Sequence, residues 1–136
     1  MSPLFWQGDE IVLAKVPANE LAIGEVITVA EEAGFLTHRY WGKTKDGLLL
    51  TKGDRSLVFD MPWKTAVLVG RVVARKRGTK TLRLDAGRGN WLVRVLGKIT
   101  AVEQRLLANH NPNNLLVKLA RRLFLATKWL PTLLIR

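Results

Sequence analysis

The chain of 136 residues contains no cysteine, only two histidines and a single tyrosine. The absence of cysteine excludes a disulfide framework, a thiolate zinc site and a cysteine nucleophile. Acidic residues are scarce in one half: residues 69–136 hold 2 acidic and 15 basic side chains, whereas residues 1–68 hold 9 acidic and 7 basic ones. The apolar fraction of 48% excludes a disordered polycation, so the sequence predicts a folded domain with unevenly distributed charge.

Long apolar runs are also absent. The first ten residues have no basic stretch followed by an apolar one, so the sequence predicts no secretory signal. No segment reaches the roughly 18 uncharged apolar residues of a spanning helix. The closest segment, residues 123–135, is interrupted by Lys128 and Pro131. We therefore expect no spanning helix, although the chain can still touch a membrane surface.

Short apolar segments separated by glycine-rich turns fill the first 85 residues. Such segments are typical of strands, and the turns at residues 45–47 and 76–78 are typical of hairpins. Gly70 is expected to mark a bulge or bend in the longest strand. The pattern favours a mainly β domain over residues 1–85, built as a sandwich or a coiled barrel. We expect strands over residues 10–15, 25–30, 34–41, 47–52, 66–76 and 79–85.

The pattern changes after residue 86, and the remainder is expected to be a basic helical extension packed on or beside the β domain. Residues 86–91 are typical of a loop. Thr100 and Glu103 form a Thr-x-x-Glu capping box, which predicts the start of a helix there. The polar segment at residues 109–114 then predicts a break between two helices.

The segment at residues 114–130 predicts an amphipathic helix that ends before Pro131. One interpretation is that its leucine face covers the β domain while its charges are solvated. Another is that the helix lies on an anionic membrane surface. The leucine face comprises Leu115, Leu116, Leu119, Leu123, Ala126 and Leu130, and the basic side chains on or beside the other face are Lys118, Arg121, Arg122 and Lys128.

A third interpretation concerns the basic cluster at residues 71–80, which could neutralise nucleic-acid phosphates. No zinc ligands, recognition helix or aromatic RNA-binding signature accompanies this cluster, so the sequence does not favour a nucleic-acid partner. The basic side chains that lie closest together are Arg75, Lys76, Arg77 and Lys80.

Five segments of the β half carry recognisable motifs. The first, at residues 3–12, has the pattern Pro-x-x-x-x-Gly-Asp. Residues 36–39 read Leu-Thr-His-Arg, and residues 50–54 read Leu-Thr-Lys-Gly-Asp. Leu-Ala-Ile-Gly-Glu-Val-Ile stands between the first two at residues 21–27, and Val-Gly-Arg-Val-Val follows at residues 69–73.

In this order and spacing, the five segments resemble the signal-peptidase-like serine peptidases, in particular the Ser-His branch that includes archaeal and endoplasmic-reticulum signal peptidases. The resemblance covers residues 1–76. It implies a coiled, strongly twisted β domain of the signal-peptidase or LexA-like type and cleavage of a peptide or protein substrate, with no metal or organic cofactor. The matched motif positions outside the catalytic group are Met1, Pro3, Gly8, Asp9, Arg39, Thr51, Lys52 and Gly53.

The resemblance also implies roles for individual residues. His38 would be the base that activates a serine, because imidazole titrates near physiological pH. The other histidine, His110, lies in a polar loop outside the resemblance. Asp60 is the preferred group to orient the imidazole, with Asp54 shaping the loop or sharing that role. Lys52 is similar to the lysine base of Ser-Lys relatives, but the presence of His38 favours a structural, loop-contacting role.

One position departs from the family pattern. When the chain is aligned on Pro3 and Gly8, Met1 takes the Met position of the family motif Ser-Met-x-Pro, so the nucleophilic serine would directly precede Met1. We expect a late start assignment or a truncation. The alternative is a relative without a nucleophile that serves as a peptide- or membrane-binding module. Ordinary packing in the core or at its rim is one interpretation of the aromatic residues, and contact with a membrane is the other. Phe5 and Trp6, which lie close to this position, are the best candidates for exposure and membrane contact.

Overall fold

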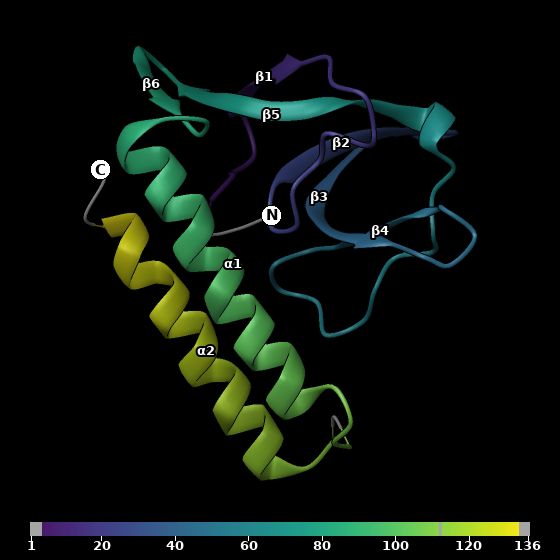
Figure 1. Ribbon diagram of the computed structural model, residues 1–136. Coiled ribbons are helices and arrows are strands. Elements are labelled where there is room, and N and C mark those ends of the chain that lie inside the picture. The colour runs from purple at the N-terminus through teal and green to yellow at the C-terminus, as the bar shows by residue number, and fades with distance from the viewer. Residues whose placement is uncertain (1–3, 112, 134–136) are drawn as a thin grey trace.

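The computed structural model describes residues 4–111 and 113–133. Its first part is mainly β, with six strands in one antiparallel sheet, and two helices follow (Figure 1). All six predicted strands are confirmed, with ends that differ by a few residues. The elements are β1 (Glu10–Ala14), β2 (Val26–Glu31), β3 (Gly34–Lys43), β4 (Leu49–Lys52), the short 3-10 helix η1 (Thr65–Val67), β5 (Leu68–Arg77), β6 (Lys80–Arg83), α1 (Gly87–Leu107) and α2 (Leu115–Leu133).

The strand order is β1-β5-β2-β3-β4, and β6 pairs with the end of β5. The register shifts within the β1–β5 and β2–β5 pairs, and β2 and β3 are strongly curved (Figure 1). Gly70 of β5 packs closely against the end of β1. A β-carbon at this position would lie 2.5 Å from the Ala14 carbonyl oxygen, so only glycine fits without a shift of the backbone.

Two apolar cores lie on opposite faces of this curved sheet. Successive residues of a strand point to opposite faces, so Val26 joins the core shared with the helices, whereas Ile27 joins the inner core. The sheet therefore has both faces covered over much of its length. The core shared with the helices comprises Leu4, Phe5, Val26, Val72, Leu84, Leu92, Val93 and Leu96, and the inner core comprises Ile27, Val29, Tyr40 and Leu49.

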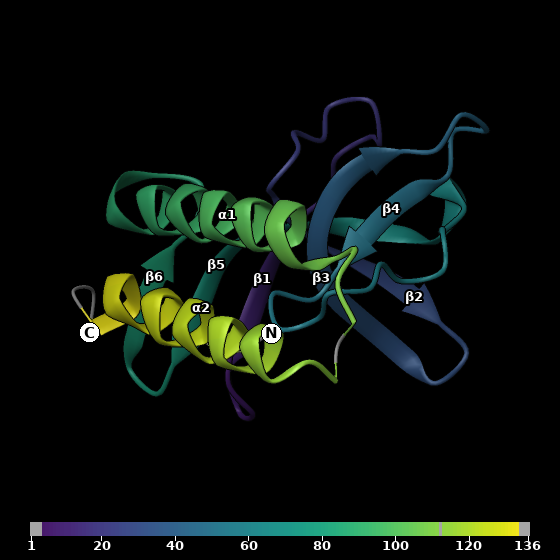
Figure 2. The same cartoon turned by 90° about the horizontal axis from the view of Figure 1, so that it is seen from below.

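The two helices form an antiparallel pair beside the sheet (Figures 1 and 2). α1 contributes Leu92, Val93 and Leu96 to the core shared with the β region. α2 packs mainly on α1. None of the helices within the described residues is long and apolar enough to cross a bilayer.

The start of α1 corrects the prediction of a loop at residues 86–91. The helix begins at Gly87, and Ala86 provides no side-chain cap for it. Gly89 is buried against β6, where a β-carbon would lie 1.7 Å from the Arg83 carbonyl oxygen. Gly89 thus reflects close packing of a helix on a strand, whereas Gly87 starts the helix with a positive φ of 57°.

Two further helix boundaries predicted from the sequence are wrong. Thr100 and Glu103 do not cap a helix, because both are buried in the interior of α1. α2 continues through Pro131 to Leu133. Pro131 lies in the last turn of α2, so a kink at this position would displace only the last two residues of the helix.

The leucine face of α2 points away from the rest of the molecule. Its leucines are between 47% and 74% exposed, so the interpretation in which this face covers the β domain is wrong. The physical reason is that α2 instead turns Val117 and the fully buried Lys128 inward. The exposed leucines are Leu115, Leu116, Leu119, Leu123, Leu130 and Leu133.

Candidate functional site

His38 lies on β3, opposite Ile27 of β2, at the rim of the inner core. Its side chain is 22% exposed, and its Nδ1 lies 2.7 Å from Oδ2 of Asp60. An ionised carboxylate only accepts hydrogen bonds, so Nδ1 carries the hydrogen in this contact while the imidazole is neutral. The second ring nitrogen, Nε2, has no hydrogen-bond partner among the described residues and is left as the basic atom.

The loop between β4 and Asp60 folds back so that the Asp60 carboxylate is held in place. The Asp60 backbone N–H donates to the Thr51 carbonyl oxygen at 2.9 Å, and the Thr51 hydroxyl donates to Asp60 Oδ2 at 2.6 Å. The Trp63 indole N–H in turn donates to the Thr51 hydroxyl oxygen at 2.9 Å. Sequence reasoning missed Trp63, because no motif marks a residue that acts only by orienting Thr51.

Gly53 leaves room beside the imidazole. A β-carbon at this position would lie 3.1 Å from His38 Nε2, closer than most side-chain contacts. The combination of a bound Nδ1 and an open Nε2 is the arrangement of a general base with an orienting carboxylate.

Asp54 has a different partner. It is fully buried, and its two carboxylate oxygens accept from Nε and Nη2 of Arg39 at 2.7 and 2.8 Å. Arg39 Nη1 also donates to the carbonyl oxygens of Gly24 and Val93, at 2.6 and 3.1 Å. Arg39 follows His38 in β3, so the two side chains point to opposite faces. The structure thus brings Asp60 to His38 and uses Asp54 to join the β region to α1.

Lys52 lies on the same face as Arg39, with which it pairs across β3 and β4. Its Nζ donates to the Ser56 carbonyl oxygen at 2.8 Å and lies 5.4 Å from the Trp41 ring centroid. Its side chain is fully buried, and this burial lowers the pKa of Lys52 from 10.5 to about 8. Lys52 therefore holds the loop that leads to Asp60 and points away from the imidazole.

The segment before β1 is tied to β5. Gly8 adopts a positive φ of 88° in a turn, and the Asp9 carboxylate accepts from the Trp6 backbone N–H at 2.8 Å. Both oxygens of Asp9 also accept from Arg77, at 2.6 and 2.7 Å, and these bonds lower the pKa of Asp9. Two other matched motif positions, Met1 and Pro3, lie outside the described residues.

Of the two candidates for exposure, Phe5 is buried, so the interpretation of Phe5 as a membrane contact is wrong. Phe5 is 9% exposed because it packs in the core shared with the helices. Trp6 is 45% exposed, lies under the Arg77 guanidinium and meets Trp129 of α2 edge to face, with ring centroids 5.6 Å apart. Arg75, another member of the basic cluster, donates to the Leu4 carbonyl oxygen at 2.8 Å.

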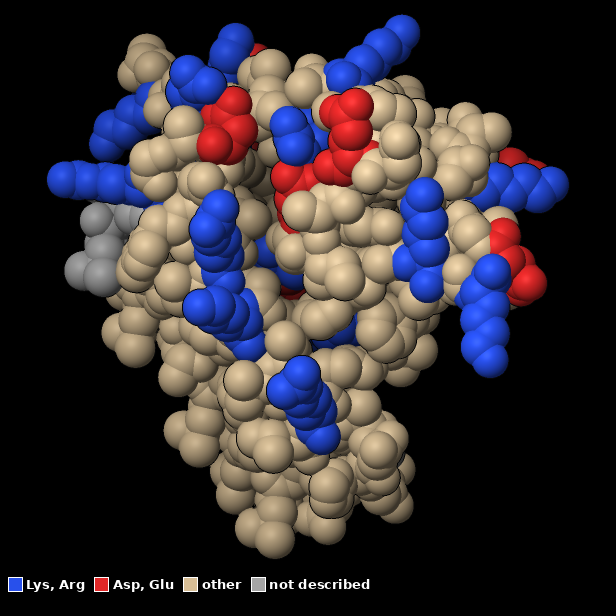
Figure 3. All heavy atoms as spheres, in the orientation of Figure 1, with Lys and Arg blue, Asp and Glu red and all other residues tan. Residues whose placement is uncertain are grey.

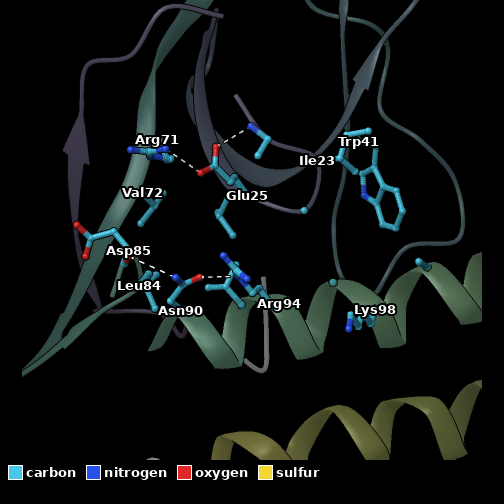
Figure 4. Close-up of a pocket in the computed structure, with 16 residues that line it drawn as sticks. Ile23, Glu25, Trp41, Arg71, Val72, Leu84, Asp85, Asn90, Arg94 and Lys98 are labelled. Atoms are coloured by element: carbon cyan, nitrogen blue, oxygen red, sulfur yellow. Dashed lines mark hydrogen bonds and ion pairs between the residues drawn. The ribbon is translucent and has the colours of Figure 1, made fainter. Parts of the chain in front are cut away.

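A separate pocket of about 540 Å³ lies between the start of β2, β5 and α1 (Figure 4). It contains neither His38 nor Asp60. Glu25 and Arg71 form an ion pair of 2.8 Å at one wall, and Trp41 stands at another (Figure 4). Sequence reasoning missed this pocket, because the residues of β2, β5 and α1 that line it lie far apart in the sequence.

No protein-family model, curated protein or solved structure matches the chain. The resemblance to signal-peptidase-like serine peptidases stays a prediction, and a functional proposal depends on the motifs and on the geometry around His38.

Proposed function

We propose that this chain is the core of a serine endopeptidase of the signal-peptidase-like type, with His38 as the base and Asp60 as the residue that orients it. The observation that carries the proposal is the 2.7 Å contact between His38 Nδ1 and Asp60 Oδ2. With Nδ1–H donated to the carboxylate, the lone pair of Nε2 is available to accept a proton.

The nucleophile in this proposal is a serine that directly precedes Met1. His38 removes the hydroxyl proton as the serine oxygen attacks the peptide carbonyl carbon, and backbone N–H groups near the serine bind the oxyanion. The imidazolium then gives its proton to the leaving amine, which leaves an acyl-enzyme that water hydrolyses by the same route. Asp60 stabilises the imidazolium in both halves of the reaction.

The finer fold assignment, a coiled β domain of the signal-peptidase or LexA-like type, belongs to the same proposal. It is supported by the curled antiparallel sheet, in which β3 carries His38 and the connection after β4 leads to Asp60. The proposed substrate is an extended peptide that binds as an additional strand, since main-chain hydrogen bonds along a sheet edge hold such peptides.

The test is a chain extended so that serine directly precedes Met1, compared with the same extension ending in alanine. Both are incubated with a library of extended peptides, and cleavage is read by mass spectrometry. We expect cleavage by the serine form only, and its loss in His38→Ala. His110→Ala is the matched control and keeps the activity. Cleavage that survives His38→Ala would overturn the proposal. A folded serine form that cleaves no peptide would favour a binding module instead.

A further inference from the structure

α2 exposes one continuous apolar face. Its six exposed leucines recur on one side of a helix with 3.6 residues per turn. From Leu115 to Leu133 the face extends about 27 Å at 1.5 Å per residue. Soluble monomers rarely expose a contiguous apolar surface of this kind, so the face marks a contact with something outside the chain.

Buried polar contacts fix how α2 is rotated about its axis. The Lys128 ammonium is fully buried, pairs with the buried Glu103 carboxylate and donates to the Asp54 carbonyl oxygen at 2.6 Å. Arg121 donates to the Arg55 carbonyl oxygen at 3.3 Å. A rotation that turned the leucines inward would leave Glu103 buried without its cation, which is strongly unfavourable. The fold therefore holds the leucines outside.

The surroundings of the leucine face are basic. α2 has four basic residues and no acidic one, and between residues 87 and 133 the sequence holds a single acid, Glu103. That acid is buried and paired, whereas Lys118 and Arg122 are exposed beside the leucines. In the view of Figure 3, the lower end of the molecule, formed by the helix pair, shows Lys and Arg but no Asp or Glu.

Two tryptophans flank the same face. Trp129 precedes Leu130 in α2 and meets the half-exposed Trp6 edge to face. The indole ring favours the boundary between headgroups and acyl chains, because it is apolar with a single N–H donor. The position of these two rings beside the leucine face therefore matches the boundary region of a bilayer in which α2 lies parallel to the membrane surface.

We infer that α2 lies on an anionic membrane surface, with its leucines in the acyl boundary and with Lys118 and Arg122 at the lipid phosphates. A second copy of the chain is disfavoured as the occupant, because two such faces would bring basic side chains together without acidic partners. This inference is independent of the peptidase proposal.

The test measures cosedimentation of the full chain with vesicles of phosphatidylcholine alone and of equal parts phosphatidylcholine and phosphatidylglycerol. We expect binding to the anionic vesicles. Leu119→Asp with Leu123→Asp should weaken it at least about tenfold, since each leucine contributes apolar burial. The matched control, Phe35→Asp with Val58→Asp, changes two residues of the β region that are 73% and 74% exposed, and keeps the binding.

A second pair of variants tests the charge. Lys118→Glu with Arg122→Glu should weaken binding to the anionic vesicles and reduce its dependence on salt, whereas Lys45→Glu with Lys64→Glu, exposed lysines of the β region, should change it less. Circular dichroism verifies that each variant folds. The inference is overturned if the unchanged chain does not bind anionic vesicles, or if the Leu119/Leu123 variant binds as tightly. A dimer of the unchanged chain in light scattering would also overturn the inference, if the dimer binds no vesicles and the Leu119/Leu123 variant is monomeric.

Discussion

The β region and the helix pair place polar and apolar groups in opposite ways. In the β region a cluster of apolar side chains fills the inner core, and the His38–Asp60 pair is partly exposed. In the helix pair the Glu103–Lys128 ion pair is inside, and a face of leucines is outside. The β region thus exposes a pair of polar side chains, whereas the helix pair exposes an apolar face beside basic side chains.

The two regions are joined by charges that have no access to solvent. Arg39 and Asp54, both of the β region, pair beside this junction, and Arg39 donates across it to the Val93 carbonyl oxygen of α1. Lys128 of α2 reaches the Asp54 carbonyl oxygen. Buried ion pairs are costly to desolvate and demand good geometry, so the junction fixes one arrangement of the helices on the sheet.

The largest expected effect is on catalytic rate, and it distinguishes the role of Asp60 from that of Asp54. In the serine-extended chain, Asp60→Asn should lower kcat/KM by up to about 10⁴-fold, because the imidazole loses its orienting carboxylate. Asp54→Asn should instead lower the midpoint of urea unfolding, because Arg39 loses its buried partner, while the activity of the folded fraction is retained. Kinetics and unfolding of both variants test this contrast, and equal loss of activity would contradict it.

A smaller effect tests the junction. Lys128→Met leaves Glu103 buried without its cation and should lower the free energy of unfolding by about 3–5 kcal/mol. The double variant Lys128→Met with Glu103→Leu should recover a large part of this loss, since both charges are then absent. Urea unfolding of the two variants measures the difference. A double variant as unstable as the single one would contradict the importance of the pair.

Gly53→Ala tests the space beside the imidazole. The added β-carbon would meet His38 Nε2 at 3.1 Å and displace the ring by a few tenths of an ångström. We expect kcat/KM of the serine-extended chain to fall about tenfold, because small displacements of catalytic groups are costly. Gly97→Ala in α1 is the control, because its φ is likewise not positive and its β-carbon would meet only ordinary contacts of 3.5 Å and more. An unchanged rate in Gly53→Ala would show that the site does not depend on this clearance.

The smallest effect concerns pH. Burial lowers the pKa of Lys52 from 10.5 to about 8, so between these values the unfolded chain binds more protons than the folded one. This group therefore makes the free energy of unfolding rise as pH increases through that range. Lys52→Met should remove this contribution. Relative to the unchanged chain, the variant should gain most in free energy of unfolding below about pH 8. Urea unfolding from about pH 7 to 10.5 tests this, and parallel pH profiles of the two proteins would contradict it.

The sequence predicted the β region far better than the helix pair, and the reason is physical. Strands can be predicted from short apolar segments bounded by turn residues, which are local features of the sequence. The six segments predicted in this way are confirmed as strands. His38 and Asp60 were named together through a family resemblance, because nothing local shows that residues 22 positions apart meet. The helix pair depends on partners far apart in the chain. A buried lysine such as Lys128 is predictable only once its carboxylate, Glu103, is placed beside it.

The geometry that carries the proposed function is tested most directly by nitrogen–proton correlation NMR of the histidine side chains, assigned with His38→Ala. The account predicts that neutral His38 carries its hydrogen on Nδ1, with Nε2 unprotonated, and that Asp60→Asn shifts this tautomer while His110 is unaffected. A neutral His38 protonated on Nε2, or a tautomer that does not respond to Asp60→Asn, would contradict the assignment of His38 as the base.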